Sequence, residues 1–142
     1  MPAADLGALG AATRPPVNDA ARPPQFRTVY ELLDFIRRSP GLYIGGTELC
    51  RIASFLDGFS FAGGFAADVR ESPSFYRFRW WLEQRLQLQP STAGWHFMLT
   101  READGDERRA TLLFFELLDE YRRVAVGNPL YEHDSSQRPG DA

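Results

Sequence analysis

The fold is decided by residues 104–124, DGDERRATLLFFELLDEYRRV. Asp104 and Glu107 have the spacing of a capping box, in which side chains satisfy the first backbone N–H groups of a helix. Apolar residues then recur every three or four positions, which is the period of a helix with a buried face. They form a stripe of Ala110, Leu113, Leu117, Tyr121 and Val124, widened by Phe114, Phe115 and Leu118. A helix that is apolar over so wide an arc contacts several neighbours, so we expect it at the centre of a bundle.

Three further helices are predicted upstream, each between residues that start and stop helices. Small hydroxyl residues cap the first backbone N–H groups, a proline fits the first turn, and glycine or a later proline ends the helix. The residue before a proline also avoids helical angles. The expected helices run from Thr28 and Glu31 to Ser39-Pro40-Gly41, from Thr47 to Gly63-Gly64, and from Ser72-Pro73 to Pro90.

Residues 91–102 fit two interpretations. Trp95, Met98 and Leu99 have helical spacing, whereas Trp95, Phe97 and Leu99 alternate as in a strand. An isolated strand would need a pairing partner, and no Asn-Gly hairpin turn supplies one. We favour a helix, and the strand stays open as an alternative. The predicted fold class is therefore mainly α, a compact bundle of four to five short helices with disordered N- and C-terminal tails.

Composition separates a folded centre from these two tails. Of the 19 aromatic residues in the chain, 17 lie within residues 27–127. Residues 1–25 contain none and carry two Pro-Pro pairs, and residues 128–142 are rich in Pro, Ser and Gly. Such segments cannot bury enough apolar surface to offset the entropy of ordering. We expect a single helical domain over residues 26–127 between disordered tails at 1–25 and 128–142.

The charge balance argues against two classes of partner. The chain has 16 basic residues, all of them arginine, and 19 acidic residues, for a formal charge of −3. General nucleic-acid binding needs a surplus of basic residues on one face, so we expect no nucleic-acid partner. No apolar run is long enough to cross a membrane, and residues 1–25 lack the pattern of a secretion signal. We therefore expect no membrane partner and a cytoplasmic location.

No catalytic, metal or cofactor site is predicted. His96 lies between two aromatic residues, a setting more typical of a core position than of a general base. Cys50 is the single cysteine, and as a nucleophile it would need a base that only His96 could supply. Asp104-Gly105-Asp106 lacks the later ligands of a calcium loop. We expect a protein that is not an enzyme and needs no cofactor. The alternative is a small ligand-binding or enzymatic domain that uses the Tyr43 loop and His96.

Arginines interleaved with aromatic residues point to a protein partner. Neighbouring helical residues diverge by about 100°, so Trp80 and Trp81 cannot share one face, and one of them should lie at a boundary. An exposed aromatic residue beside arginine is the composition of an interface hot spot. The same helix could stack bases, but Glu71 and Glu83 offset its arginines. The expected partner-binding residues are Arg37, Arg38, Tyr43, Arg77, Trp80, Trp81, Glu116 and Glu120.

A longer pattern covers residues 28–123. It consists of Leu-Leu-Asp-Phe-Ile-Arg-Arg-x-Pro-Gly-Leu-Tyr-Ile-Gly at 32–45, Phe-Leu-Asp-Gly-Phe at 55–59, Phe-x-x-Trp-Leu at 78–82, Trp95, and Phe-Phe-Glu-Leu-Leu-Asp-Glu-Tyr at 114–121. This pattern resembles small bacterial proteins of the immunity type, which belong to polymorphic toxin systems. The resemblance implies a cytoplasmic protein that blocks a cognate toxin domain by covering its active site. It carries over no catalytic residue.

Overall fold

The computed structural model of this protein describes residues 26–65, 71–89 and 92–132, and at Leu42 and Tyr43 it describes the backbone alone. Its described part is a helical bundle, which confirms the predicted fold class. Phe26 and Phe65 form an isolated parallel bridge. The helices are α2 (Val29–Arg38), α3 (Pro40–Tyr43), α4 (Leu49–Phe61), α5 (Phe78–Arg85), α6 (Trp95–Glu102) and α7 (Glu107–Val124), with 3₁₀ turns η2 (Phe75–Arg77) and η3 (Pro129–Tyr131).

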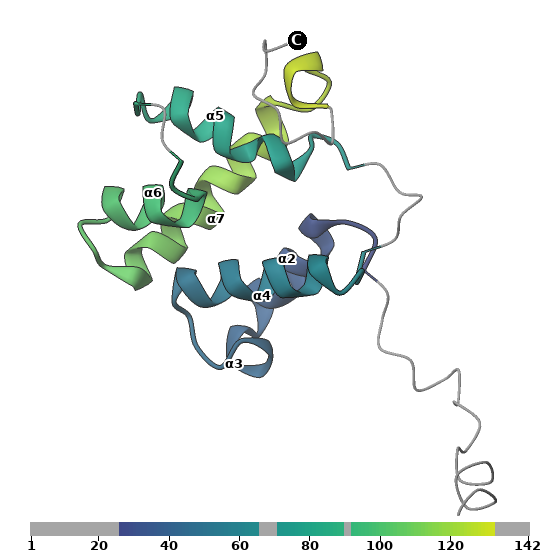
Figure 1. Ribbon diagram of the computed structural model, residues 1–142, viewed down its shortest axis with the longest axis vertical. Coiled ribbons are helices and arrows are strands. Elements are labelled where there is room, and N and C mark those ends of the chain that lie inside the picture. The colour runs from purple at the N-terminus through teal and green to yellow at the C-terminus, as the bar shows by residue number, and fades with distance from the viewer. Residues whose placement is uncertain (1–25, 66–70, 90–91, 133–142) are drawn as a thin grey trace, which may run out of the picture.

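Helix α7 packs on several neighbours through its broad apolar arc, as predicted, but its opposite face is exposed, so it does not lie at the centre of the bundle. It contacts α4, α5 and α6, and Figure 1 shows it alongside α5 and α6, with α2 and α4 below them. At its C-terminal end Val124 is exposed, so the predicted stripe stops one turn earlier than expected. The buried face consists of Ala110, Phe114, Phe115, Leu117, Leu118 and Tyr121.

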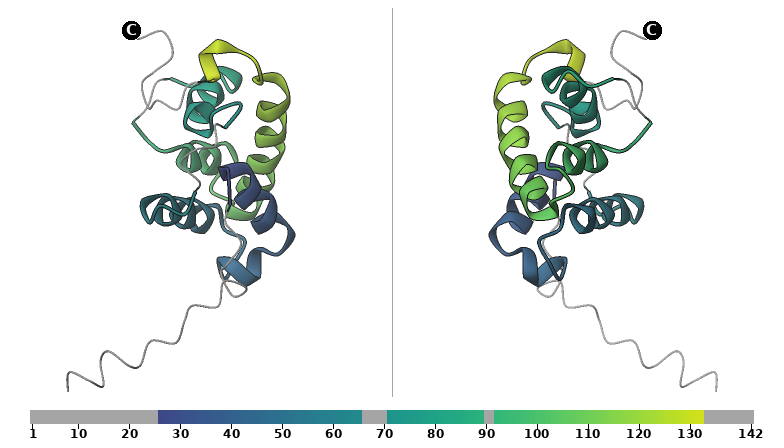
Figure 2. Two further views of the ribbon diagram at one scale, coloured as in Figure 1. Left: turned by 90° about the vertical axis from the view of Figure 1, so that its right-hand side faces the viewer. Right: turned by 90° about the vertical axis from the view of Figure 1, so that its left-hand side faces the viewer.

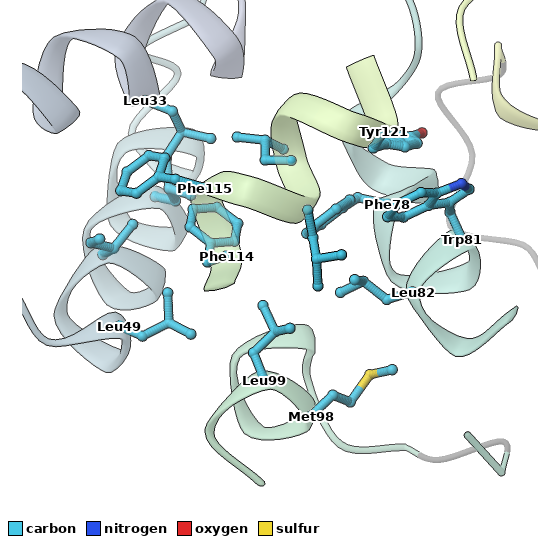
Figure 3. Close-up of a cluster of buried hydrophobic side chains, with 14 of the residues drawn as sticks. Leu33, Leu49, Phe78, Trp81, Leu82, Met98, Leu99, Phe114, Phe115 and Tyr121 are labelled. Atoms are coloured by element: carbon cyan, nitrogen blue, oxygen red, sulfur yellow. The ribbon is translucent and has the colours of Figure 1, made fainter. Parts of the chain in front are cut away.

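The core beneath α7 combines aliphatic side chains with a connected set of aromatic rings (Figure 3). Phe78 is fully buried, with ring centroids 5.8 Å from Phe114 and 5.3 Å from Tyr121. Trp95 stacks on Phe114 at 4.6 Å. Offset and edge-on ring pairs of this kind add a favourable electrostatic term to the burial of apolar area. The rings therefore fix α5 and α6 against the buried face of α7.

Two buried tyrosines fasten the chain segment before α5 to the rest of the bundle. The hydroxyl of Tyr30 on α2 donates to the carbonyl of Pro73, and the hydroxyl of Tyr121 on α7 donates to the carbonyl of Ser74. Burial raises the pKa of both tyrosines well above the usual value of 10.0, because an ionised phenol would lose its hydration. Both hydroxyls therefore stay protonated as donors.

Helix ends agree with the sequence at some positions and differ at others. Thr28 caps α2 by accepting from the backbone N–H of Glu31, as predicted. The prediction that Asp104 caps α7 is wrong. Asp104 has φ +55° and follows the end of α6, whereas the carboxylate of Asp106 accepts from two N–H groups of α7. The cause is a six-residue closing turn at the end of α6, in which the N–H of Gly105 bonds to the carbonyl of Thr100.

The two middle helices start later than expected. Glu48 rather than Thr47 is the N-cap of α4, and α5 begins at Phe78 after the turn η2 instead of at Ser72-Pro73. A buried carboxylate explains the second difference, because Glu71 accepts from the backbone N–H groups of both Val29 and Phe75. This carboxylate holds the start of η2 beside the start of α2. Residues 95–102 form α6, so the helical interpretation is confirmed there.

The fold continues past the expected domain boundary at residue 127. Tyr131 in η3 is buried against Tyr121, and its carbonyl accepts from the N–H of Ser74 at 2.7 Å. Polar residues and a proline surround Tyr131 in the sequence, so composition alone did not indicate that this segment packs on the core. The predicted tails overlap the described structure only at residues 128–132, which include η3. The rest of both tails lies outside the described residues. No helix within residues 26–65, 71–89 and 92–132 has the length and apolar character to cross a membrane.

Candidate partner-binding groove

A half-open hollow of about 530 Å³ lies where α7 meets the ends of α2, α3 and α4. We call it the α7 groove. Figure 2 shows α7 along one edge of the molecule, with α2 and α3 toward its lower end. The groove is lined by Arg37, Pro40, Thr47, Ile52, Arg108, Thr111, Leu112, Phe115, Glu116 and Asp119.

One stripe of α7 forms a full wall of the groove. Six lining residues, from Arg108 to Asp119, recur on α7 at intervals of three and four positions. With a rise of 1.5 Å per residue, that stripe is about 16 Å long. The opposite wall comes from the C-terminal end of α2 and the segments around α3 and α4. A hydrogen bond from the Thr111 hydroxyl to the carbonyl of Thr47, 2.6 Å long, joins the two walls.

The surface of the groove is mainly apolar. Leu112 is 74% exposed at the rim, and Phe115 is 8% exposed beneath it. Pro40 and Ile52 complete the apolar lining from the opposite wall. A large exposed leucine beside an apolar hollow costs solvation free energy in the isolated chain, and such patches mark interaction sites in folded proteins.

Charged residues border this apolar surface in two different ways. Arg37 forms an ion pair with Asp119, in which its Nη1 nitrogen donates to both carboxylate oxygens at 2.9 and 3.0 Å, and its guanidinium lies 5.0 Å from the centre of the Phe115 ring. Arg108 and Glu116 are exposed, and neither forms an ion pair with another residue of the described chain. The groove thus carries one internal ion pair and two exposed charges, Arg108 and Glu116, of which Glu116 also interacts electrostatically with Arg85.

The structure brings together only some of the residues that the sequence analysis singled out. Arg37 and Glu116 both line the α7 groove. Arg38 is exposed but is not part of the lining, and Glu120 is bound to Arg85 by an ion pair of 2.8 Å. The side chain of Tyr43 lies outside the described part of the chain, so its role remains a prediction.

Two expected anchors are not on the surface. Arg77 is 6% exposed and Trp81 is 8% exposed, so neither can anchor a partner in this structure. Trp81 lies three positions after Phe78 and stacks on its ring, which puts the tryptophan on the core face of α5. Trp80 is half-buried at the boundary beneath the guanidinium of Arg79, 4.6 Å from its ring. The boundary position of Trp80 agrees with the expectation that Trp80 and Trp81, about 100° apart around the helix, cannot share one face.

The alternative site around His96 gains no support from its surroundings. The imidazole lies 4.2 Å from the ring of Phe97 and does not line the α7 groove. Cys50 is exposed near the start of α4, where its backbone N–H donates to the Glu107 carboxylate at 3.4 Å. Within the described residues, no group of three or more His, Cys, Asp or Glu side chains is arranged to hold a metal ion.

Arg108 and Leu112 line the groove but were not among the partner-binding residues expected from the sequence. Both belong to the helix expected at the centre of the bundle, and the position of Leu112 in the sequence could have indicated its role. Leu112 is a large apolar residue that stands outside the predicted stripe, next to Thr111. An apolar residue on the polar side of an amphipathic helix is a candidate contact. What the sequence could not supply was the opposite wall, because that depends on how α2 to α4 pack.

Comparisons with known proteins add no family to these observations. No protein-family model matches the chain, and neither a curated protein nor a solved structure does so.

Proposed function

We propose that this chain is a non-enzymatic protein-binding domain and that the α7 groove is its binding face. The observation that carries the proposal is the exposed Leu112 over a largely apolar, half-open hollow with charges at its border. Grooves of this shape receive an apolar face of a partner helix or loop, and the border charges select and orient the partner.

For the partner, we propose a toxin domain that the chain neutralises by covering its active site. The support for this step is the resemblance of residues 28–123 to immunity-type proteins. Such a role needs a rigid, preformed face more than a catalytic centre, since a rigid face loses little conformational entropy on binding. The Arg37–Asp119 pair and the Thr111–Thr47 hydrogen bond hold the two walls of the groove in place.

The test uses the full chain and the purified C-terminal domain of a toxin encoded beside its gene. We expect a complex that survives size exclusion and a loss of toxin activity in the complex. Leu112→Glu places a charge at the apolar border and should weaken binding by at least about tenfold, or about 1.4 kcal/mol. The matched control is Val124→Glu, an exposed apolar residue of α7 outside the groove, which should bind as the unaltered chain does.

Two results would count against the proposal. Absence of both binding and inhibition removes the immunity role, and equal binding by the Leu112→Glu and unaltered chains removes the groove as the binding face. Circular dichroism of each variant shows whether the helical fold is retained.

A further inference from the structure

The open charges of the α7 groove are arranged symmetrically about its exposed leucine. Arg108 stands four residues before Leu112, and Glu116 stands four residues after it. All three side chains are exposed, and all three line the groove. Arg108 and Glu116 are therefore about 12 Å apart along α7, on opposite sides of an apolar centre.

This arrangement is complementary to itself when two copies of α7 run antiparallel. If a twofold axis passes beside Leu112, each residue of α7 faces the residue of the other copy that stands equally far from Leu112 in the opposite direction along the helix. Arg108 of each copy then faces Glu116 of the other, and the two Leu112 side chains meet at the axis. A parallel pairing would instead bring like charges together, which is unfavourable. The stripe thus matches one geometry, that of a symmetric interface in which the same patch serves both partners.

We infer that the α7 groove binds a second copy of this chain, antiparallel along α7, when no other partner occupies it. Two opposite-charge pairs then close over an apolar centre made by Leu112, Phe115 and the lining from α2 to α4. Because the patch is small, the homodimer forms at high protein concentration and dissociates on dilution. The inference rests on the proposed role of the groove as a protein-binding face. A toxin domain at that face must displace the second copy and form a one-to-one complex.

A charge-swap experiment tests this pairing with the full chain. In Arg108→Glu both interface pairs become acid against acid, and in Glu116→Arg both become base against base. Sedimentation velocity over a wide range of concentrations should show each variant to be at least about tenfold weaker in self-association than the unaltered chain.

The decisive sample is an equimolar mixture of the two variants. The glutamate introduced in one chain would face the arginine introduced in the other, and the remaining pair would be the native Arg108 and Glu116, so opposite charges meet at both positions. The mixture should recover association that neither variant shows alone, and the double variant R108E/E116R should recover the homodimer. Arg123→Glu is the matched control, because it changes an exposed arginine of α7 outside the groove. It should associate as the unaltered chain does.

The outcomes separate this inference from the proposed function. A chain that stays monomeric at every concentration, or a mixture that fails to recover association, overturns the homodimer. Toxin binding through Leu112 would still stand in that case. If the homodimer forms and no toxin domain is bound, the proposed immunity role fails and the antiparallel pairing remains.

Discussion

The two faces of α7 belong to the same helix but have different roles: one packs in the core and the other lines the groove. On the inner face Phe114, Leu118 and Tyr121 are buried against three neighbouring helices and a layer of rings. On the groove face Leu112 is exposed, and the neighbouring positions carry charge. At 100° per residue, Leu112 points about 120° to 180° away from these three buried residues, so the two faces lie on nearly opposite sides of the helix. The difference teaches that substitutions on one helix can separate folding from binding.

The largest expected effect comes from the inner face. Phe114→Ala removes a fully buried ring that stacks on Trp95 and lies edge-on to Phe78. Truncation of a buried Phe costs about 3–5 kcal/mol, because transfer free energy is lost and a cavity remains. Urea unfolding followed by circular dichroism measures this loss. A decrease below about 1 kcal/mol would mean that the ring layer does not hold α7 as described.

The inner face is also the part of the molecule that the sequence predicted best. Its residues recur with the helical period, and that period depends only on the local chain. The sequence-based predictions failed where one local sequence pattern fits more than one structural role. Asp104 has capping-box spacing but closes α6, and Trp81 has a hot-spot composition but stacks on Phe78. The groove could not be predicted because Pro40 and Ile52 come to face α7 only through tertiary packing.

The second prediction concerns the hydroxyl of Tyr121 at the end of the inner face. Tyr121→Phe keeps the ring but leaves the buried carbonyl of Ser74 without this donor. The Ser74 carbonyl still accepts from the backbone N–H of Arg77 at 3.1 Å, so the loss should be that of one hydrogen bond, about 0.5–1.5 kcal/mol. Urea unfolding at neutral pH gives the value. Tyr76→Phe, at an exposed position, is the control and should change the free energy of unfolding by less than about 0.5 kcal/mol.

The same hydroxyls make stability depend on pH on the alkaline side. Burial raises the pKa of Tyr30 and Tyr121 in the folded state above the value of 10.0 expected in the unfolded chain. The folded state therefore keeps protons that the unfolded state loses, so stability is complete below pH 10 and falls as the pH rises further. The slope is at most about 1.4 kcal/mol per pH unit for each tyrosine. The chain has no lysine, so no ammonium side chain titrates in this range.

Unfolding measured between neutral and strongly alkaline pH in the unaltered chain and in Tyr121→Phe tests this dependence. The variant should lose stability less steeply, because it lacks one of the three buried phenols, those of Tyr30, Tyr121 and Tyr131, whose pKa burial raises. Parallel curves above pH 10 would contradict the assignment of the pH dependence to Tyr121.

A smaller effect is expected from the ion pair at the border of the groove. Arg37 and Asp119 are each close to half exposed, at 44% and 49% of their side-chain surface. Water and salt screen such a pair, so its coupling free energy should be about 0.2–1 kcal/mol. A double-mutant cycle of Arg37→Ala and Asp119→Ala, followed by urea unfolding, isolates that coupling. A coupling above about 2 kcal/mol would show that the pair braces α2 against α7 far more strongly than its exposure allows.

The smallest effect on stability is expected at Leu112, only two positions before Phe114 on the same helix. Leu112 is 74% exposed, so Leu112→Ala removes little buried area, and alanine favours a helix slightly more than leucine does. The free energy of unfolding at low protein concentration should therefore change by less than about 0.5 kcal/mol. Self-association should weaken in the same variant, because the two Leu112 side chains meet at the proposed twofold axis. A large loss of stability would show that Leu112 belongs to the core after all, and the contrast between the two faces of α7 would fail. Unchanged stability together with unchanged association would leave that contrast intact but would remove Leu112 from the binding face.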